Sequence, residues 1–265
     1  MTPRVALVTG AARGIGAATV RALLADGWSV LAVDAAADDP ALPYALGTRQ
    51  ELDGLVAAER PAAPGRIHPF VADVRDGGAL RAAVAEAVDR WGGLDAAIGC
   101  AGVIGGGVPL WEMPEDRLRA VLDVNLGGIV ELARAAVPAL LERPAPRSGR
   151  FVAVASAAAT RGLPMLAAYC AAKAGVAGLV RALAVELGES GVTANAVSPG
   201  STDTPILAES ARLYDLAGPQ VFAAQQPLRR LLEPAEVAAA IAFLASPAAG
   251  GVTGAVVPVD AGLAL

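Results

Sequence analysis

The sequence predicts a single α/β domain over residues 1–265, in which seven parallel strands form a doubly wound sheet with helices on both faces. Short apolar segments alternate with amphipathic helical patterns along the chain, which is the arrangement of βαβ units. The 265 residues fit one large domain with ample length to bury a core. Hydrophobic residues make up 55% of the chain and charged residues 18%, so we expect both faces of the sheet to be covered.

The first predicted strand, residues 4–9, leads directly into a glycine-rich segment and then into a helix that ends near residue 26. Glycines at this point permit a tight turn and let backbone N–H groups approach a pyrophosphate at the helix N-terminus. The segment therefore predicts a dinucleotide-binding loop, with the candidate residues Gly10, Arg13, Gly14, Ile15 and Gly16.

The second predicted strand, residues 29–33, ends at Asp34, which lies 18 residues after Gly16. A carboxylate there can accept hydrogen bonds from an adenosine ribose and repels a 2′-phosphate, which favours NAD over NADP. Arg13 points the other way, because a basic residue in the loop can meet that phosphate. We give Asp34 more weight, and the alternative is that Asp34 is only a turn residue at the end of a strand.

The segment of about residues 35–66 is longer than a usual crossover and contains a predicted helix over 49–59. Its place beside the expected adenosine site makes it a candidate lid. A surface excursion without function is the alternative.

The third strand, residues 67–72, is expected to close with Asp73 and Val74, where a carboxylate can reach the adenine amino group. A helix over 78–91 leads to a fourth strand over 94–98. That strand ends in the small residues Cys100, Ala101 and Gly102, which leave room for a cofactor ribose. A long helix over 115–141 carries Asn125, and an asparagine inside a helix calls for a hydrogen-bonding explanation.

The fifth strand, residues 150–155, ends at Ser156, and a helix over 167–187 follows with Tyr169 and Lys173 at positions i and i+4. Lys173 is the only lysine of the chain. Side chains at this spacing share one helix face, so the ammonium is expected to lower the pKa of the phenol from its usual ~10 towards neutrality. Such a phenol can exchange the proton of an alcohol that is converted to a ketone. A partly buried pair without chemistry is the alternative.

The last third of the chain predicts a sixth strand over 193–197, a helix over 234–244 and a seventh strand over 255–259. Pro199 and Gly200 follow the sixth strand. Residues 201–226 are expected to be irregular, to shape a substrate pocket and to move. Several residues suggest that this pocket is mostly hydrophobic, although they can equally be core or subunit contacts: Pro164, Met165, Leu166, Ile206, Leu207, Leu213 and Phe222.

Composition excludes several classes of function. The net charge of −5 without a basic cluster argues against nucleic acid or an anionic membrane as partner. Apolar runs are interrupted by charges or glycines before they reach the ~20 residues of a spanning helix. The single histidine, His68, excludes a histidine-based metal site and a Ser-His-Asp triad. Two cysteines make no disulfide framework, and a strand so near the N-terminus leaves no room for a signal peptide, so a cytoplasmic setting is expected.

Together these motifs resemble the short-chain dehydrogenase/reductase family over essentially the whole chain. The motif TGxxxGxG matches Thr9 to Gly16, and the catalytic set of the family matches Asn125, Ser156, Tyr169 and Lys173. The resemblance implies a Rossmann-like three-layer sandwich, a homotetramer, and hydride transfer between NAD and a small alcohol or ketone. In that family a threonine after the Pro-Gly pair binds the nicotinamide carboxamide, and here Thr204 is the better match and Thr202 the alternative.

The resemblance also implies roles for the four candidate residues. Tyr169 exchanges the hydroxyl proton, while Lys173 lowers its pKa and binds the nicotinamide ribose. Ser156 stabilises the substrate oxygen, and Asn125 orders a water molecule that links Lys173 to solvent. One departure is Gly99-Cys100-Ala101-Gly102, where the family usually has Asn-Asn-Ala-Gly, so two side-chain partners near the cofactor are missing.

A finer resemblance, to the mycofactocin-coupled subgroup, rests on DDPALPYALGT, CAGVIGGG and VTANAVSPGSTDTP. It implies a tightly bound NAD that does not exchange with solution and is recycled in place by the redox carrier mycofactocin. Two alternatives remain open. One is an ordinary carbonyl or 3-oxoacyl reductase with freely exchanging NADPH, and the other is an NAD(H)-binding regulator without catalysis.

Overall fold

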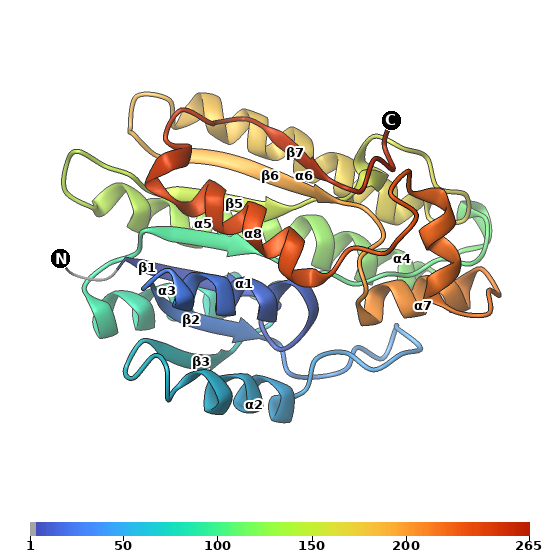
Figure 1. The fold of residues 1–265 in the computed structure, drawn as a ribbon, viewed down its shortest axis with the longest axis horizontal. Coiled ribbons are helices and arrows are strands. Elements are labelled where there is room, and N and C mark those ends of the chain that lie inside the picture. Colours follow the sequence, from blue (N-terminus) through green and yellow to red (C-terminus); the bar gives the residue numbers. More distant parts are fainter. Residues whose placement is uncertain (1–3) are drawn as a thin grey trace.

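The computed structural model describes residues 4–265 and confirms the predicted fold class. The seven strands are parallel and follow the order β3-β2-β1-β4-β5-β6-β7 (Figure 1). Their bounds are β1 Val5–Thr9, β2 Ser29–Asp34, β3 Ile67–Val71, β4 Ala96–Gly99, β5 Arg150–Val154, β6 Thr193–Pro199 and β7 Val256–Val259. Five of them, β1, β2, β4, β5 and β6, are buried along almost their whole length, as expected for a sheet covered on both faces.

Two hydrophobic clusters, one on each face of the sheet, hold the helical layers in place. One face is covered by α1 (Gly14–Ala25), α2 (Arg49–Glu59) and α8 (Pro234–Ala245), whose buried residues join the inner strands in one cluster. The other face is covered by α3 (Gly77–Trp91), α5 (Gly128–Glu142) and α6 (Ala167–Glu186). Helix α7 (Pro205–Leu213) lies beyond the carboxyl ends of the strands (Figure 1).

The strand order reverses at β1, which pairs with β2 on one side and β4 on the other. Thr9 at the end of β1 is level with Val33 of β2 and with Gly99 of β4. The loops that follow these strands therefore leave the sheet at the same edge, and they diverge to opposite faces. Ligands of open α/β sheets bind in the crevice at such a point.

Three predicted segments need correction. The third strand ends at Val71, so Asp73 and Val74 lie in the turn that follows it. The predicted helix over 115–141 is divided into α4 (Glu115–Leu122), a π-helical turn (Asp123–Gly127) and α5. Residues 201–226 are not irregular throughout, because they contain α7 and a 3-10 helix (Pro219–Gln225).

The helix α7 carries a start signal that the sequence analysis missed. Thr204 is its N-cap, with a side-chain oxygen that accepts a hydrogen bond from the backbone N–H of Leu207, and Pro205 occupies the first helical position. A threonine followed by proline is a common way to begin a helix.

Two helical stretches, Glu115–Glu142 and Ala167–Glu186, are long and apolar enough to span a membrane by length and composition. The charges and glycines that interrupt the apolar runs therefore do not by themselves exclude helices of membrane-spanning length and composition. Both stretches lie within this domain, and buried residues of α5 and α6 belong to the same core cluster as the strands. Core helices of ordinary domains pass the same test, so it carries no conclusion about a membrane.

Candidate active site

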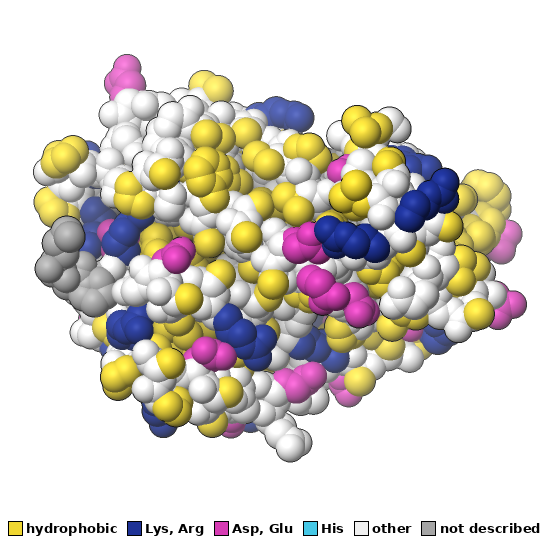
Figure 2. All heavy atoms as spheres, viewed as in Figure 1, with side chains coloured by type: hydrophobic (Ala, Val, Ile, Leu, Met, Phe, Trp, Pro, Cys, Tyr) yellow, Lys and Arg dark blue, Asp and Glu magenta, His cyan; other side chains and the backbone are white. Residues whose placement is uncertain are grey.

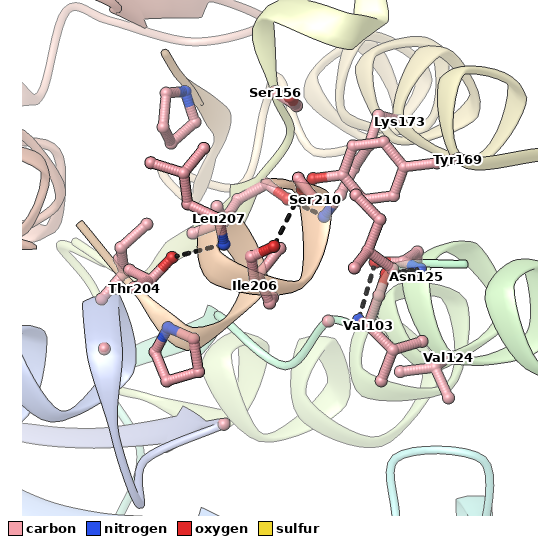
Figure 3. A pocket seen from close by; sticks show the side chains of 18 of the residues that line it. Val103, Val124, Asn125, Ser156, Tyr169, Lys173, Thr204, Ile206, Leu207 and Ser210 are labelled. Atoms are coloured by element: carbon pink, nitrogen blue, oxygen red, sulfur yellow. Dashed lines mark hydrogen bonds between the residues drawn. The ribbon is translucent and has the colours of Figure 1, made fainter. Parts of the chain in front are cut away.

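A cavity of about 680 Å³ lies at the carboxyl ends of the strands and is lined by every residue that the sequence analysis selected for catalysis or cofactor binding. The four catalytic candidates Asn125, Ser156, Tyr169 and Lys173 are all in its lining. Figure 3 shows Tyr169 and Lys173 projecting into it from one helix, with Asn125 nearby and Ile206, Leu207 and Ser210 of α7 on another side.

Tyr169 and Lys173 lie one turn apart near the start of α6, as their spacing predicts. The side-chain ammonium of Lys173 is 5.6 Å from the centre of the Tyr169 ring and donates a hydrogen bond of 2.8 Å to the carbonyl oxygen of Val154. Only 3% of the Lys173 surface is exposed. The lysine is therefore fixed beneath the cavity by the end of β5.

Burial dominates the ionisation of both groups. It lowers the pKa of Lys173 to about 8 and raises the pKa of Tyr169 to about 12. Hydrogen bonding from Ser156 opposes the increase for Tyr169 but does not cancel it. The expectation that the pKa of the phenol lies near neutrality is thus wrong for the protein chain by itself, because the cost of burying a phenolate exceeds the benefit of the Ser156 hydrogen bond.

Ser156 follows β5 and caps a short 3-10 helix (Ala157–Ala159). Its Oγ accepts a hydrogen bond of 3.1 Å from the backbone N–H of Ala158. Because the oxygen is held by a backbone donor, the hydroxyl proton remains available to an oxygen atom in the cavity. This is the arrangement needed for a donor that stabilises charge on a substrate oxygen.

Asn125 lies in the π-helical turn and is fully buried. Its side-chain amide donates hydrogen bonds of 2.8 Å to the carbonyl oxygens of Val121 and Val103, and its Oδ1 accepts one from the backbone N–H of Val103 at 3.3 Å. The asparagine therefore joins the helix to the loop after β4, which explains its place in a helical segment. Its ordering of a water molecule stays a prediction.

The glycine-rich loop forms a cradle that side chains would fill. Gly10 has a φ of +65°, and a Cβ built on it would be 2.6 Å from the backbone nitrogen of Ala101. The N-cap of α1, Arg13, makes no side-chain capping hydrogen bond, so the first turn keeps free N–H groups beside the cavity. Such a helix start binds a pyrophosphate, and the residues present fit a dinucleotide.

Gly102 connects this cradle to the catalytic candidates. A Cβ at that position would be 3.0 Å from Oδ1 of Asn125 and 3.7 Å from Nζ of Lys173. Cys100, two residues earlier, is partly buried, and burial raises the pKa of its thiol to about 12. The absence of a side chain at Gly102 thus leaves space in the cavity beside Asn125 and Lys173.

The carboxylate of Asp34 accepts hydrogen bonds from the backbone N–H groups of Ala12 at 2.9 Å and Ala36 at 3.0 Å. It lies at the end of β2 in the cavity wall, where the sequence analysis placed it. Arg13 also lines the cavity, but its guanidinium donates to the carbonyl oxygen of Ala45 at 2.7 Å and lies 4.0 Å from Glu51. The one basic residue of the loop is therefore engaged by the inserted segment.

Asp73 lines the cavity, but its carboxylate is paired with Arg75, which donates to it from the backbone and from the guanidinium. Arg75 also donates a hydrogen bond of 2.7 Å to the buried carboxylate of Asp39. Arg75 was not among the predicted site residues, because an arginine after a strand has no pattern that distinguishes it from a surface residue.

The first part of the inserted segment 35–66, residues 35–48, is here called the strap and forms part of the cavity wall. Ala35, Ala37, Asp38, Asp39, Tyr44, Leu46 and Gly47 of the strap are in the cavity lining. Leu42 is buried in the core, and the Oη of Tyr44 accepts a hydrogen bond of 2.9 Å from the backbone N–H of Ile104. A capping box between Thr48 and Glu51 ends the strap and begins α2.

Thr202 and Thr204 both line the cavity, below Pro199 and Gly200. The hydroxyl of Thr204 donates to the carbonyl oxygen of Thr202 at 3.2 Å, and that of Thr202 donates to Gly200 at 3.1 Å. Both hydroxyls are thus satisfied locally.

The part of the cavity beside α7 is largely apolar. Of the pocket residues suggested by the sequence, Met165 and Leu213 are absent from the cavity lining, whereas the others line it: Pro164, Leu166, Ile206, Leu207 and Phe222. Arg161 adds a guanidinium that donates to the carbonyl oxygen of Leu263 at 2.7 Å.

The chain matches a family model described as enoyl-(acyl carrier protein) reductase over residues 10–264. It is 40% identical over 259 residues to cis-4-hydroxycyclohexanecarboxylate dehydrogenase of Sinomonas cyclohexanicum, covering 98% of this chain and 96% of that protein. It is 36% identical over 281 residues to (-)-trans-carveol dehydrogenase of Rhodococcus erythropolis, covering 99% and 98%. Among solved structures, carveol dehydrogenase from Mycobacterium avium in complex with NAD superimposes with a TM-score of 0.91 at 32% identity, covering 98% and 97%.

The buried position of Lys173 predicts an unusual titration. Because Lys173 is the only lysine of the chain, protein labelled with [ε-13C]lysine gives a single lysine resonance. In nucleotide-free protein we expect its NMR titration midpoint near pH 8, where burial places the pKa, and in urea-unfolded protein near the usual ~10.4. A folded-state midpoint at or above that of the unfolded chain would contradict the assignment.

Proposed function

The chain belongs to the short-chain dehydrogenase/reductase family, and we propose that it oxidises apolar alcohols to carbonyl compounds, and catalyses the reverse reaction, through Tyr169, Ser156, Lys173 and Asn125. It is an NAD-dependent oxidoreductase that acts on alcohol groups. The observation that carries the proposal is the meeting of these four side chains in one cavity that also contains the glycine cradle and Asp34.

The residues of the chain handle the proton in this scheme. Ser156 donates its hydroxyl hydrogen to the substrate oxygen and holds it beside Tyr169. Tyr169 takes the proton of the alcohol during oxidation and returns it to the carbonyl oxygen during reduction. The neutral phenol favoured by burial is the form needed for reduction.

Oxidation needs the phenolate, which requires positive charge in the cavity. Lys173 supplies one such charge below its pKa of about 8, from a position held by the carbonyl of Val154. A dinucleotide held by the glycine cradle would supply the hydride acceptor and, in its oxidised form, a second positive charge. Asn125 keeps the loop after β4 in place, so Gly102 leaves space in the cavity beside Asn125 and Lys173.

We assign the dinucleotide to the glycine cradle, with Asp34 on the adenosine ribose. The carboxylate at the end of β2 repels a 2′-phosphate. Arg13, the residue that would favour NADP, is held by Ala45 and lies near Glu51. Both observations support NAD over NADP and argue against the reductase with freely exchanging NADPH.

We further propose that NAD is held tightly and recycled by mycofactocin. Support comes from the strap, which has three separate attachments: Asp39 to Arg75, Ala45 to Arg13, and Tyr44 to Ile104. The strap can move away from the cavity only if these three contacts break together. We therefore expect it to slow dissociation of a nucleotide bound beneath it. An enzyme with a retained nucleotide needs a separate electron acceptor, which is the role proposed for mycofactocin. We place this function in the cytoplasm, where both free cysteines would stay reduced.

A homotetramer is the proposed assembly. The edge strand β7 is only partly covered, and Phe243 of the adjacent α8 is 51% exposed. Figure 2 shows hydrophobic side chains gathered in the region where Figure 1 places β7 and α8, with charges of both signs elsewhere on this face. Only 39% of the most apolar 18-residue stretch of α6 is buried, and Val185 in this helix is 83% exposed. Apolar edges and helix faces of this kind are normally covered by another copy.

Substituting Tyr169→Phe tests the proposed chemistry. The variant keeps the ring but loses the hydroxyl, so we expect kcat/KM for alcohol oxidation to fall about 10³-fold or more, while the NAD content of the purified protein is unchanged. The matched control is Cys170→Ala, the next residue on the same helix, which should retain activity. Substantial turnover by Tyr169→Phe would refute the role of the phenol.

Cofactor identity and retention are tested together by denaturing the purified protein and analysing the supernatant. We expect about one equivalent of NAD or NADH per chain and no NADP, with alcohol turnover that depends on an artificial electron acceptor rather than on added NAD. Protein that is empty and works with added NADPH would indicate the ordinary reductase. Retained nucleotide with no turnover of any alcohol would indicate the regulator.

The assembly is tested by light scattering of the eluted protein during gel filtration. The expected mass is about four times that of one chain, because both the β7 edge and the α6 face need a partner. A monomeric mass at micromolar concentration would contradict the proposal.

A further inference from the structure

The strap residue Tyr44 contacts the loop that follows β4. Its Oη accepts the hydrogen bond from the N–H of Ile104, five residues beyond Gly99 at the end of β4. Tyr44 and Ile104 are both in the lining of the cavity that contains Tyr169. The adenosine end is instead marked by Gly47, where a Cβ would be 2.9 Å from the Asp34 carboxylate.

The charged neighbours of Tyr44 come from both parts of the cavity: Arg13 from the glycine-rich loop, and Glu209 and Tyr169 from the substrate side. Burial raises the pKa of Tyr44 to about 12. The Ile104 N–H and the charge of Arg13 oppose this increase, whereas Glu209 and Tyr169 add to it. Glu209 lies on α7, is 6% exposed and is paired with Arg212. Tyr44 therefore lies where the strap meets the loop after β4, between Arg13 on the cofactor side and α7 and Tyr169 on the substrate side.

The loop after β4, which holds Tyr44 through Ile104, is tightly packed. The backbone N–H of Gly107 donates to the carbonyl oxygen of Met165 at 3.1 Å, and a Cβ on Gly107 would be 3.2 Å from the Leu213 side chain. The same loop is tied to Asn125 at Val103. Because Ile104 lies within this tightly packed loop, its N–H fixes the position of the Tyr44 ring.

We propose that Tyr44 is a specificity-determining residue: its ring forms part of the wall of the substrate chamber and limits the bulk of the alcohol that reaches Tyr169 and Ser156. The strap thus shapes the substrate chamber in addition to covering the dinucleotide. This inference rests on the proposed function, since it requires an alcohol to bind beside Tyr169. The Tyr44 hydroxyl anchors the strap, and the ring selects the substrate.

Two variants separate the contribution of the Tyr44 hydroxyl from that of the Tyr44 ring. Tyr44→Phe keeps the ring but leaves the N–H of Ile104 without its acceptor, so nucleotide loss should become about tenfold faster with substrate preference unchanged. Tyr44→Ala removes the ring and opens the chamber. The control is Leu46→Ala, which shortens a strap residue near the adenosine end and should loosen the strap without enlarging the substrate chamber.

The experiment compares cyclohexanol with 4-tert-butylcyclohexanol in the nucleotide-loaded protein. For Tyr44→Ala the ratio of kcat/KM, bulky over small, should rise about tenfold or more, while Tyr44→Phe and Leu46→Ala should stay within about twofold of the unaltered chain. Calorimetric dissociation constants of the two corresponding ketones should shift in the same direction. If Tyr44→Ala does not fold, Tyr44→Leu should give a smaller shift of the same sign.

An unaltered ratio in Tyr44→Ala, with an active parent protein, would overturn the inference and leave the proposed function intact. An equal change in Tyr44→Ala and Leu46→Ala would also overturn it, because loosening of the strap would then explain both. If the unaltered protein oxidises no alcohol with any electron acceptor, the proposed function itself fails.

Discussion

A buried lysine beside a partly buried tyrosine is the constraint on which the site depends. Removing both groups from water disfavours the charged form of each, so the pKa of Lys173 falls and that of Tyr169 rises. The chain tolerates this because Val154, at the end of a central strand, gives the ammonium a hydrogen-bond acceptor. The strand that ends at Val154 also leads to Ser156 two residues later, so one strand end positions two functional groups, the ammonium of Lys173 and the hydroxyl of Ser156. In the protein alone the Tyr169 phenol is neutral, which is the form needed for reduction. Additional positive charge in the cavity would favour the phenolate, which is the form needed for oxidation.

Most of the fold could be predicted because its signals are local. Apolar runs marked the seven strands, and the switch from β1 to a glycine-rich loop placed the crevice before any tertiary information was used. The spacing of Tyr169 and Lys173 gave their common helix face directly. Strand and helix limits were less certain, because the exact end of β3 depends on pairing with β2 and not on the residues Asp73 and Val74 themselves.

What could not be predicted depends on contacts between distant segments. The pKa of Tyr169 was expected to fall, since the sequence shows the lysine but not the degree of burial. Arg75 and Tyr44 carry no motif, and their importance comes from partners such as Asp39 and Ile104 that lie far along the chain. The division between α4 and α5 was also invisible, because helical patterns on both sides of Asn125 read as one long helix.

The π-helical turn between α4 and α5 restricts changes in the length of this segment. The π-helical turn at Asp123–Gly127 inserts one residue into an otherwise continuous rod, and one residue corresponds to a rotation of about 100°. Deleting it would restore regular geometry but rotate α5 about its axis, turning Ile129, Leu132 and Leu140 away from the sheet. The π-helical turn therefore sets the rotation of α5 relative to α4, so that each helix buries its own apolar face. It also holds Asn125 in place. Single-residue length changes between residues 115 and 142 should be poorly tolerated, even far from the cavity.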